Sequence, residues 1–177
     1  FVATANSIKY CNAEPLFLDV DRDTMGLSPT ALEAFLEEYS IMRNGSCYNK
    51  ITNKRIKACI PMHTFGFPCR IIEICKICAN FGIKVIEDAA EAFFSFYKKK
   101  YLGTFGDLGC FSLSPNKIIT SGQGGLIVTN SNTLSKKLRL YKNQGRFGLP
   151  SGGDDDYIST GGNFKLSNIS SGLALSE

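Results

Sequence analysis

The sequence predicts an α/β domain built on a largely parallel β-sheet. Short apolar segments alternate with amphipathic ones, as strands alternate with crossover helices in such domains. The chain has 177 residues, of which 44% are hydrophobic, and this is enough for one domain with a substantial core. Nothing in the composition indicates a fibre or a disordered protein.

The individual elements follow from apolar period and from turn residues. The expected strands are short apolar runs, and the expected helices have apolar residues three or four positions apart. Ser28-Pro29 supports the first helix, because Ser caps helix N-termini and Pro is favoured in the first turn. In chain order, we expect a strand at residues 16–20, a helix at 29–39, a strand at 58–62, a helix at 71–80, strands at 84–87, 109–113 and 125–129, and helices at 132–142 and 167–177.

Two polar segments interrupt this alternation. Residues 42–55 contain Asn44-Gly45 and predict a surface insertion or a hairpin. Residues 145–162 contain three aspartates and several glycines, and we expect a mobile loop because the apolar pattern resumes at Phe164. The sequence begins at Phe1 without a Met and ends inside an expected helix, so we interpret the chain as an internal piece of a longer protein.

The charge and the apolar runs exclude several classes of protein. The formal charge of +4 is too small to indicate a nucleic-acid partner. No apolar run approaches the roughly 20 residues that cross a bilayer, and the first residues do not resemble a signal peptide. We therefore expect a cytoplasmic protein with no membrane partner.

The seven cysteines are spread along the chain and are odd in number, which favours reduced thiols over disulfides. Cys75 and Cys78 form a CxxC within an apolar helical pattern. We expect them to pack in the core, because a zinc site would need a second pair of ligands. No metal site is predicted.

Candidate chemical groups follow the expected strands, where ligands collect in open α/β sheets. Asp88 ends a buried strand, and an unpaired carboxylate there is costly, which indicates either a fixed cationic partner or a cap on the next helix. Lys117 lies in a loop after another strand. Partial burial suits such a lysine to form an imine with an aldehyde, although a loop lysine alone is usually only solvated. Ser112 offers a hydroxyl to an anion, beside a glycine-rich segment.

Three segments carry a resemblance. They are VIEDAAEA at residues 85–92, GTFGDLGCFS at 103–112 and NKIITSGQGG at 116–125. In order, spacing and length they closely resemble the DegT/DnrJ/EryC1/StrS family of nucleotide-sugar aminotransferases. FVATAN at residues 1–6 and NFKLSN at 163–168 also resemble segments of this family.

The resemblance implies a cofactor, a fold and a set of roles. The cofactor is pyridoxal 5'-phosphate (PLP), and the fold is the three-layer α/β/α large domain of fold-type I PLP-dependent enzymes. Residues 1–177 would be most of that domain, without its N-terminal segment and the C-terminal small domain. Lys117 would hold PLP as a Schiff base and move a proton, Asp88 would bond the pyridine nitrogen, Ser112 would bind the phosphate and Phe1 would stack on the ring. Glu91 would lie near the ring hydroxyl, where the family most often has Gln or His.

Three further positions follow from the same resemblance. His63, the only histidine, lies in a segment similar to the family's strand-end histidine motif, and we interpret it as shaping the pocket. With one histidine, a Ser-His-Asp triad or a His-rich metal site has little support. Gln123 stands where the family has Glu, and Lys165 where it has Arg, which leaves the details of the substrate open.

The implied reaction moves an amino group from glutamate to a keto group of a nucleotide-linked deoxysugar, in aminosugar or surface-glycan biosynthesis. The segments 42–55 and 61–66 resemble branches that act on UDP-linked 4-keto sugars. The full-length protein would be a homodimer. One alternative is a sugar dehydratase of the same family, but those enzymes replace the lysine that Lys117 retains. Others are a non-catalytic regulatory relative, and a nucleotide-binding domain without PLP, which would need a glycine-rich turn after the first strand.

Overall fold

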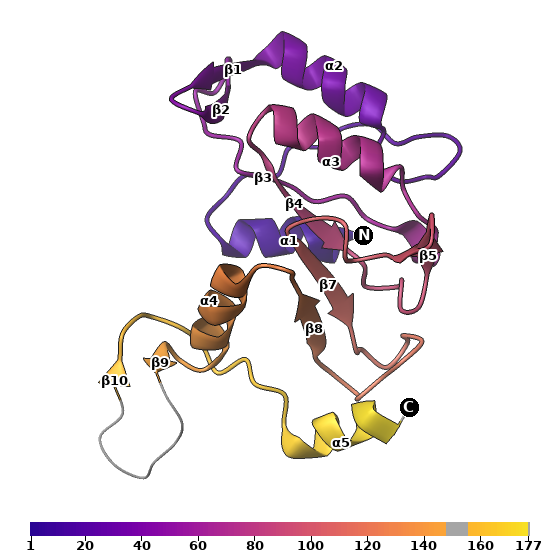
Figure 1. Cartoon of the computed structure of the whole chain (residues 1–177), viewed down its shortest axis with the longest axis vertical. Helices are drawn as coiled ribbons and strands as arrows, with labels where there is room; N and C mark the ends of the chain where they lie inside the picture. The colour runs from indigo at the N-terminus through magenta and orange to yellow at the C-terminus, as the bar shows by residue number, and fades with distance from the viewer. Residues whose placement is uncertain (148–155, 177) are drawn as a thin grey trace.

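A four-stranded sheet forms the centre of the molecule, in the order β3-β4-β7-β8 (Figure 1). The computed structural model describes residues 1–147 and 156–176. The strands are β3 (Ala58–Cys59), β4 (Lys84–Asp88), β7 (Leu108–Ser112) and β8 (Gly125–Val128). The first three run parallel and β8 pairs antiparallel with β7, which confirms the largely parallel sheet.

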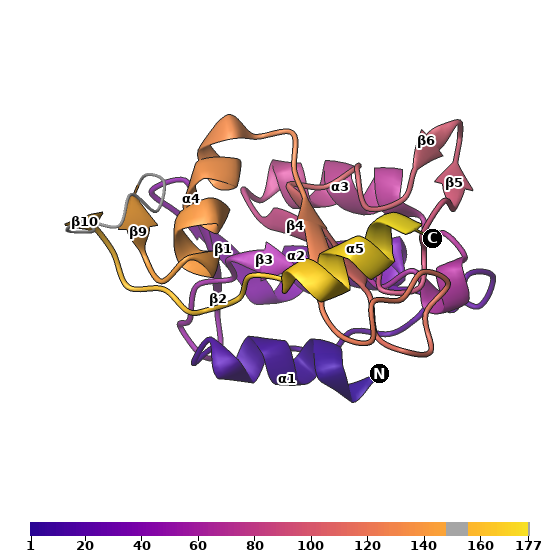
Figure 2. The same ribbon diagram turned by 90° about the horizontal axis from the view of Figure 1, so that it is seen from below.

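Helices cover both faces of this sheet. Helix α1 (Val2–Tyr10) lies on one face and α3 (Ile71–Asn80) on the other, with α2 (Pro29–Tyr39) packed on α3 (Figure 2). Helices α4 (Asn132–Lys142) and α5 (Asn168–Ser176) follow β8. The arrangement is therefore the expected three-layer α/β/α one. No helix in the described ranges is long and apolar enough to cross a membrane.

The main core lies between α2, α3 and one face of β4. Its buried side chains include Leu36, Ile71, Ile74 and Val85. Along β4, Val85 and Glu87 are buried while their neighbours are more exposed, as the two-residue period of a strand requires. Asp88 consequently lies on the opposite face from Glu87, toward α1. Cys78 is buried in this core and Cys75 packs against it, which confirms the expected packing of the CxxC segment.

Several short elements surround the sheet. Strands β1 (Ser40–Arg43) and β2 (Ser46–Asn49) form an antiparallel hairpin, which confirms the hairpin expected in residues 42–55. Asn44 and Gly45 form its turn with φ angles of 48° and 71°, and these residue types tolerate such angles. The remaining short elements are η1 (Thr64–Gly66), β5 (Phe96–Tyr97), β6 (Lys100–Tyr101), β9 (Arg146–Phe147) and β10 (Asp156–Tyr157).

Two expectations about the first half of the chain are wrong. Residues 16–20 form no strand: only Val20 makes a single bridge, to Leu27, and Phe17 is 78% exposed. The expected strand at 58–62 is reduced to β3, because Pro61 has no N–H to donate to a ladder. Helix α1 was not expected, since its apolar residues show no clear helical face. The mobile loop expected at 145–162 includes residues 148–155, which lie outside the described ones.

Candidate active site

The carboxyl ends of β4 and β7 meet at one edge of the sheet. Asp88 ends β4 and Ser112 ends β7, and the two strands are parallel neighbours. The loop from β7 to β8 contains Lys117 and returns to Gly125, which pairs with Ser112. The candidate residues therefore converge on one edge from separate segments, the usual position of ligand sites in open α/β sheets.

Asp88 is half-buried and held from three directions. Its Oδ2 accepts a hydrogen bond of 2.6 Å from Thr4 Oγ1 of α1, and its Oδ1 accepts one of 3.2 Å from the Ala90 N–H. Its backbone pairs with Pro61 and His63, on the strand-end segment after β3. No lysine or arginine in the described ranges forms an ion pair with Asp88. The carboxylate thus closes a local turn through its bond to the Ala90 N–H. Because no lysine or arginine of the described ranges pairs with it, it can accept from a cationic ligand.

Lys117 and Glu91 form an ion pair at this edge. Lys117 Nζ lies 3.0 Å from Glu91 Oε1, and only 13% of the lysine side chain is exposed. The other carboxylate oxygen of Glu91 accepts a hydrogen bond of 3.2 Å from the Phe65 N–H. The structure therefore brings Lys117 next to Glu91, which lies three residues after Asp88 in the chain.

Ser112 is held within its own loop. Its hydroxyl donates to Ser114 Oγ at 3.0 Å and accepts from the Ser114 N–H at 3.2 Å. Two hydroxyls and a backbone N–H therefore stand together at the end of β7. Such a group of donors suits an anion, although no hydrogen bond among the described residues joins Ser112 to Lys117 or Asp88.

Phe1 stands at the start of α1 and is 89% exposed. The structure brings Thr4, one helical turn later, onto Asp88. Sequence reasoning singled out Phe1 and missed Thr4. The only signal for Thr4 was a hydroxyl residue within the segment at residues 1–6 that resembles the family.

His63 and Glu87 form a buried pair behind the site. His63 Nε2 donates to Glu87 Oε2 at 2.9 Å, because Nδ1 already accepts from the Cys69 N–H. Three backbone N–H groups also donate to Glu87, those of Gly103, Phe105 and Gly106.

This network keeps Glu87 ionised. Burial alone would raise the pKa of the Glu87 carboxyl, but the bonds from His63 and from the backbone N–H groups outweigh it and hold that pKa below its usual range. His63 is 1% exposed and joins Glu87 to the segment that contains Cys69.

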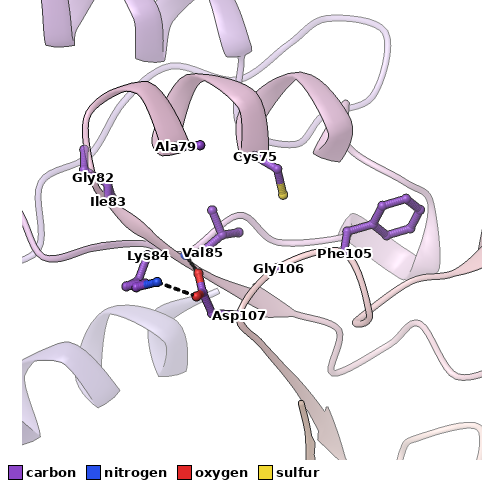
Figure 3. A pocket seen from close by; sticks show the side chains of 9 residues that line it. All are labelled: Cys75, Ala79, Gly82, Ile83, Lys84, Val85, Phe105, Gly106 and Asp107. Atoms are coloured by element: carbon purple, nitrogen blue, oxygen red, sulfur yellow. Dashed lines mark hydrogen bonds and ion pairs between the residues drawn. The ribbon is translucent and has the colours of Figure 1, made fainter. Parts of the chain in front are cut away.

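A cavity of about 460 Å³ lies at the opposite edge, at the amino ends of β4 and β7 (Figure 3). Its lining includes Cys75 and Val85, and Lys84 Nζ pairs with Asp107 Oδ1 there at 2.8 Å. Because none of the predicted site residues line this cavity, we do not assign it to the site.

The groups at the carboxyl edge fit PLP. Asp88 has a charge with no cationic partner among the described residues, which suits a protonated ring nitrogen. Lys117 supplies a mostly buried amine, and Ser112 and Ser114 supply donors for a phosphate. Solved aminotransferases share the fold of this chain, which is that of the fold-type I class of PLP-dependent enzymes. Within that class, the model of the DegT/DnrJ/EryC1/StrS aminotransferase family matches residues 1–177, and the chain belongs to this family.

Three similar proteins illustrate the family. The GDP-perosamine synthase of Escherichia coli O157:H7 is 38% identical over 177 residues, which are 100% of this chain and 43% of that protein. Helicobacter pylori PseC, an aminotransferase involved in the biosynthesis of pseudoaminic acid, matches with a TM-score of 0.83 and 27% identity over 99% of this chain and 43% of its own. DesI, solved with its TDP-sugar product, matches with a TM-score of 0.79 and 27% identity over 99% and 39%. The chain thus spans less than half the length of these relatives.

Proposed function

We propose that this chain is most of the PLP-binding large domain of an aminotransferase that moves an amino group from glutamate to a keto group of a nucleotide-linked deoxysugar. The observation that carries the proposal is the position of Asp88, at the end of β4, and of Lys117, in the loop after the neighbouring parallel strand β7, in a member of this family. Relatives named for a GDP-sugar and a TDP-sugar support a nucleotide-sugar substrate. UDP-linked 4-keto sugars remain our first candidate substrates, and keto sugars linked to GDP or TDP are further candidates.

Asp88 would hold the pyridine nitrogen of PLP. Thr4 Oγ1 and the Ala90 N–H each bond one oxygen of the carboxylate and so fix its orientation. An ionised carboxylate at this place keeps the ring nitrogen protonated, and the protonated ring supplies an electron sink for the reaction.

Lys117 would bind PLP covalently through Nζ and act as the base. As a free amine, Nζ would accept, hold and return the proton that the reaction moves at this edge of the sheet. The low exposure of the side chain restricts access of water to this amine. Lys117 also argues against the dehydratase alternative, because the family's dehydratases lack this lysine.

Ser112, Ser114 and Phe1 would complete the cofactor site. The Ser114 hydroxyl donates to no described residue and could donate to the phosphate, and the Ser112 hydroxyl and the Ser114 N–H would turn to it from the bonds that they now make to each other. Phe1 has its ring in solvent at the start of α1 and so is free to stack on the cofactor.

The free thiols of all seven cysteines support a reducing compartment, and we propose the cytoplasm. By the same resemblance, we propose that the full-length protein is a homodimer.

A screen for amino transfer tests this function. The full-length protein would be incubated with PLP, glutamate and keto sugars linked to UDP, GDP or TDP, and 2-oxoglutarate and aminosugar would be measured. We expect product with at least one nucleotide, none with Lys117→Ala, and normal activity with Glu33→Gln, which alters an exposed carboxylate on α2. Cofactor binding without transfer to any keto sugar would favour the non-catalytic alternative.

A further inference from the structure

One backbone N–H and one side chain converge on the Glu91 carboxylate. Its Oε1 lies 3.0 Å from Lys117 Nζ, on the loop after β7, and its Oε2 accepts from the Phe65 N–H at 3.2 Å, on the loop after β3. Each oxygen of the carboxylate therefore has its own donor. The Glu91 side chain is 38% exposed. The bridge that it forms between Lys117 and the Phe65 N–H therefore lies at the edge of the site rather than in the core.

The loop that provides the Phe65 N–H is held in an unusual conformation. Phe65 has φ 52° and ψ 29°, a left-handed conformation that is rare for a bulky residue and costs free energy. Gly66 follows with φ 81°, and a Cβ at Gly66 would come within 2.7 Å of the Glu91 carbonyl oxygen. The two segments therefore approach closely, and the strained backbone directs its N–H at Glu91.

From this geometry we propose that Glu91 is a positioning residue for Lys117. Through a bridge that requires a carboxylate, it fixes the amine relative to the loop after β3. A glutamine side chain has one acceptor oxygen, and its other terminal group is an amide NH2, which donates. In Glu91→Gln, either the Phe65 N–H or the Lys117 ammonium would therefore face a donor. The inference rests on the proposed function and goes beyond it, because it assigns Glu91 to the lysine rather than to the ring of the cofactor.

Two measurements on Glu91→Gln test the positioning role, and we expect them to change in opposite directions. The first is the rate of reductive methylation of Lys117 by formaldehyde and cyanoborohydride without PLP, read by peptide mass against the exposed Lys137 of α4. A small reagent needs only a free amine, so loss of the ion pair should raise this rate about fivefold.

The second measurement is the fraction of Lys117 that carries PLP after a short incubation and borohydride reduction. PLP must meet the amine in one orientation, so loss of the bridge should lower this fraction about threefold or more. Glu33→Gln should match the wild type in both measurements, and circular dichroism should show that all variants are folded.

Other outcomes would overturn the proposal. Equal methylation rates in wild type and Glu91→Gln would show that the bridge does not form in solution. A rise in both methylation and PLP capture would show that Glu91 only masks the amine. A wild-type protein that never carries PLP on Lys117 would instead contradict the proposed function, and the methylation rates would still decide whether the bridge exists.

Discussion

Asp88 is the residue on which the cofactor assignment most depends, and its orientation rests on few groups. Thr4 Oγ1 and the Ala90 N–H are the donors that its carboxylate oxygens accept from within the described ranges. The chain order alone predicted Asp88 and Lys117 at one edge of the sheet, because strand ends share an edge. Thr4 and Ser114 could not be predicted that way, since their contacts depend on how α1 and the β7–β8 loop lie in space.

Removing the Thr4 hydroxyl should weaken PLP binding. In Thr4→Val, Asp88 Oδ2 loses its donor while the shape of the side chain is kept, and one hydrogen bond to a charged group corresponds to about 1.5 kcal/mol, or about tenfold in affinity. A titration with PLP followed by absorbance checks this expectation, and Thr4→Ser should bind nearly as the wild type. Unchanged affinity in Thr4→Val would show that Thr4 does not orient Asp88.

Glu87 should contribute to the response of stability to acid. Its pKa is lowered in the folded chain, so its contribution to the free energy of unfolding is present at neutral pH and is lost as the pH falls below about 4.3, through the folded pKa. Urea unfolding at several pH values measures this loss. A free energy of unfolding that stays level over that acidic range would contradict the account.

Glu87→Gln should be costly at neutral pH as well. Four donors converge on the carboxylate, and an amide in either orientation would turn its NH2 toward two of them. Leaving buried donors unpaired costs about 3 kcal/mol in total. The same urea measurement at pH 7 checks this value, with Glu33→Gln as the matched control on an exposed site.

Among the elements, helices were predicted best. Helices α2, α3 and α4 begin and end where apolar spacing and capping residues placed them. The strand expected at 16–20 failed because an apolar run does not reveal whether a pairing partner is near. Helix α1 was missed because it has no buried residues and no clear amphipathic face, although its Thr4 hydroxyl bonds Asp88.

The N-terminal cap of α2 gives a test at this scale. Ser28 Oγ accepts from the Ala31 N–H at 3.3 Å, and Pro29 occupies the first turn. Because Ser28→Ala removes this acceptor, we expect a loss of about 1 kcal/mol in the free energy of unfolding. Chemical denaturation followed by circular dichroism measures it, and PLP binding should be unchanged because α2 lies on the far side of α3 from the site.

At the scale of the whole molecule, the sheet separates two regions with different chemistry. The carboxyl edge gathers an aspartate without a cationic partner among the described residues, a mostly buried lysine and a cluster of hydroxyls. The amino edge holds a cavity whose lysine and aspartate pair with each other. We therefore propose the carboxyl edge as the cofactor site.

The most direct test of this account is the identification of the residue that carries PLP. The full-length protein would be mixed with PLP, reduced with borohydride and digested, and the modified peptide would be located by mass. The account predicts the adduct on Lys117, a visible absorption band before reduction, and loss of both in Lys117→Ala. A folded full-length protein without an adduct, or with the adduct only on exposed lysines such as Lys137, would contradict it.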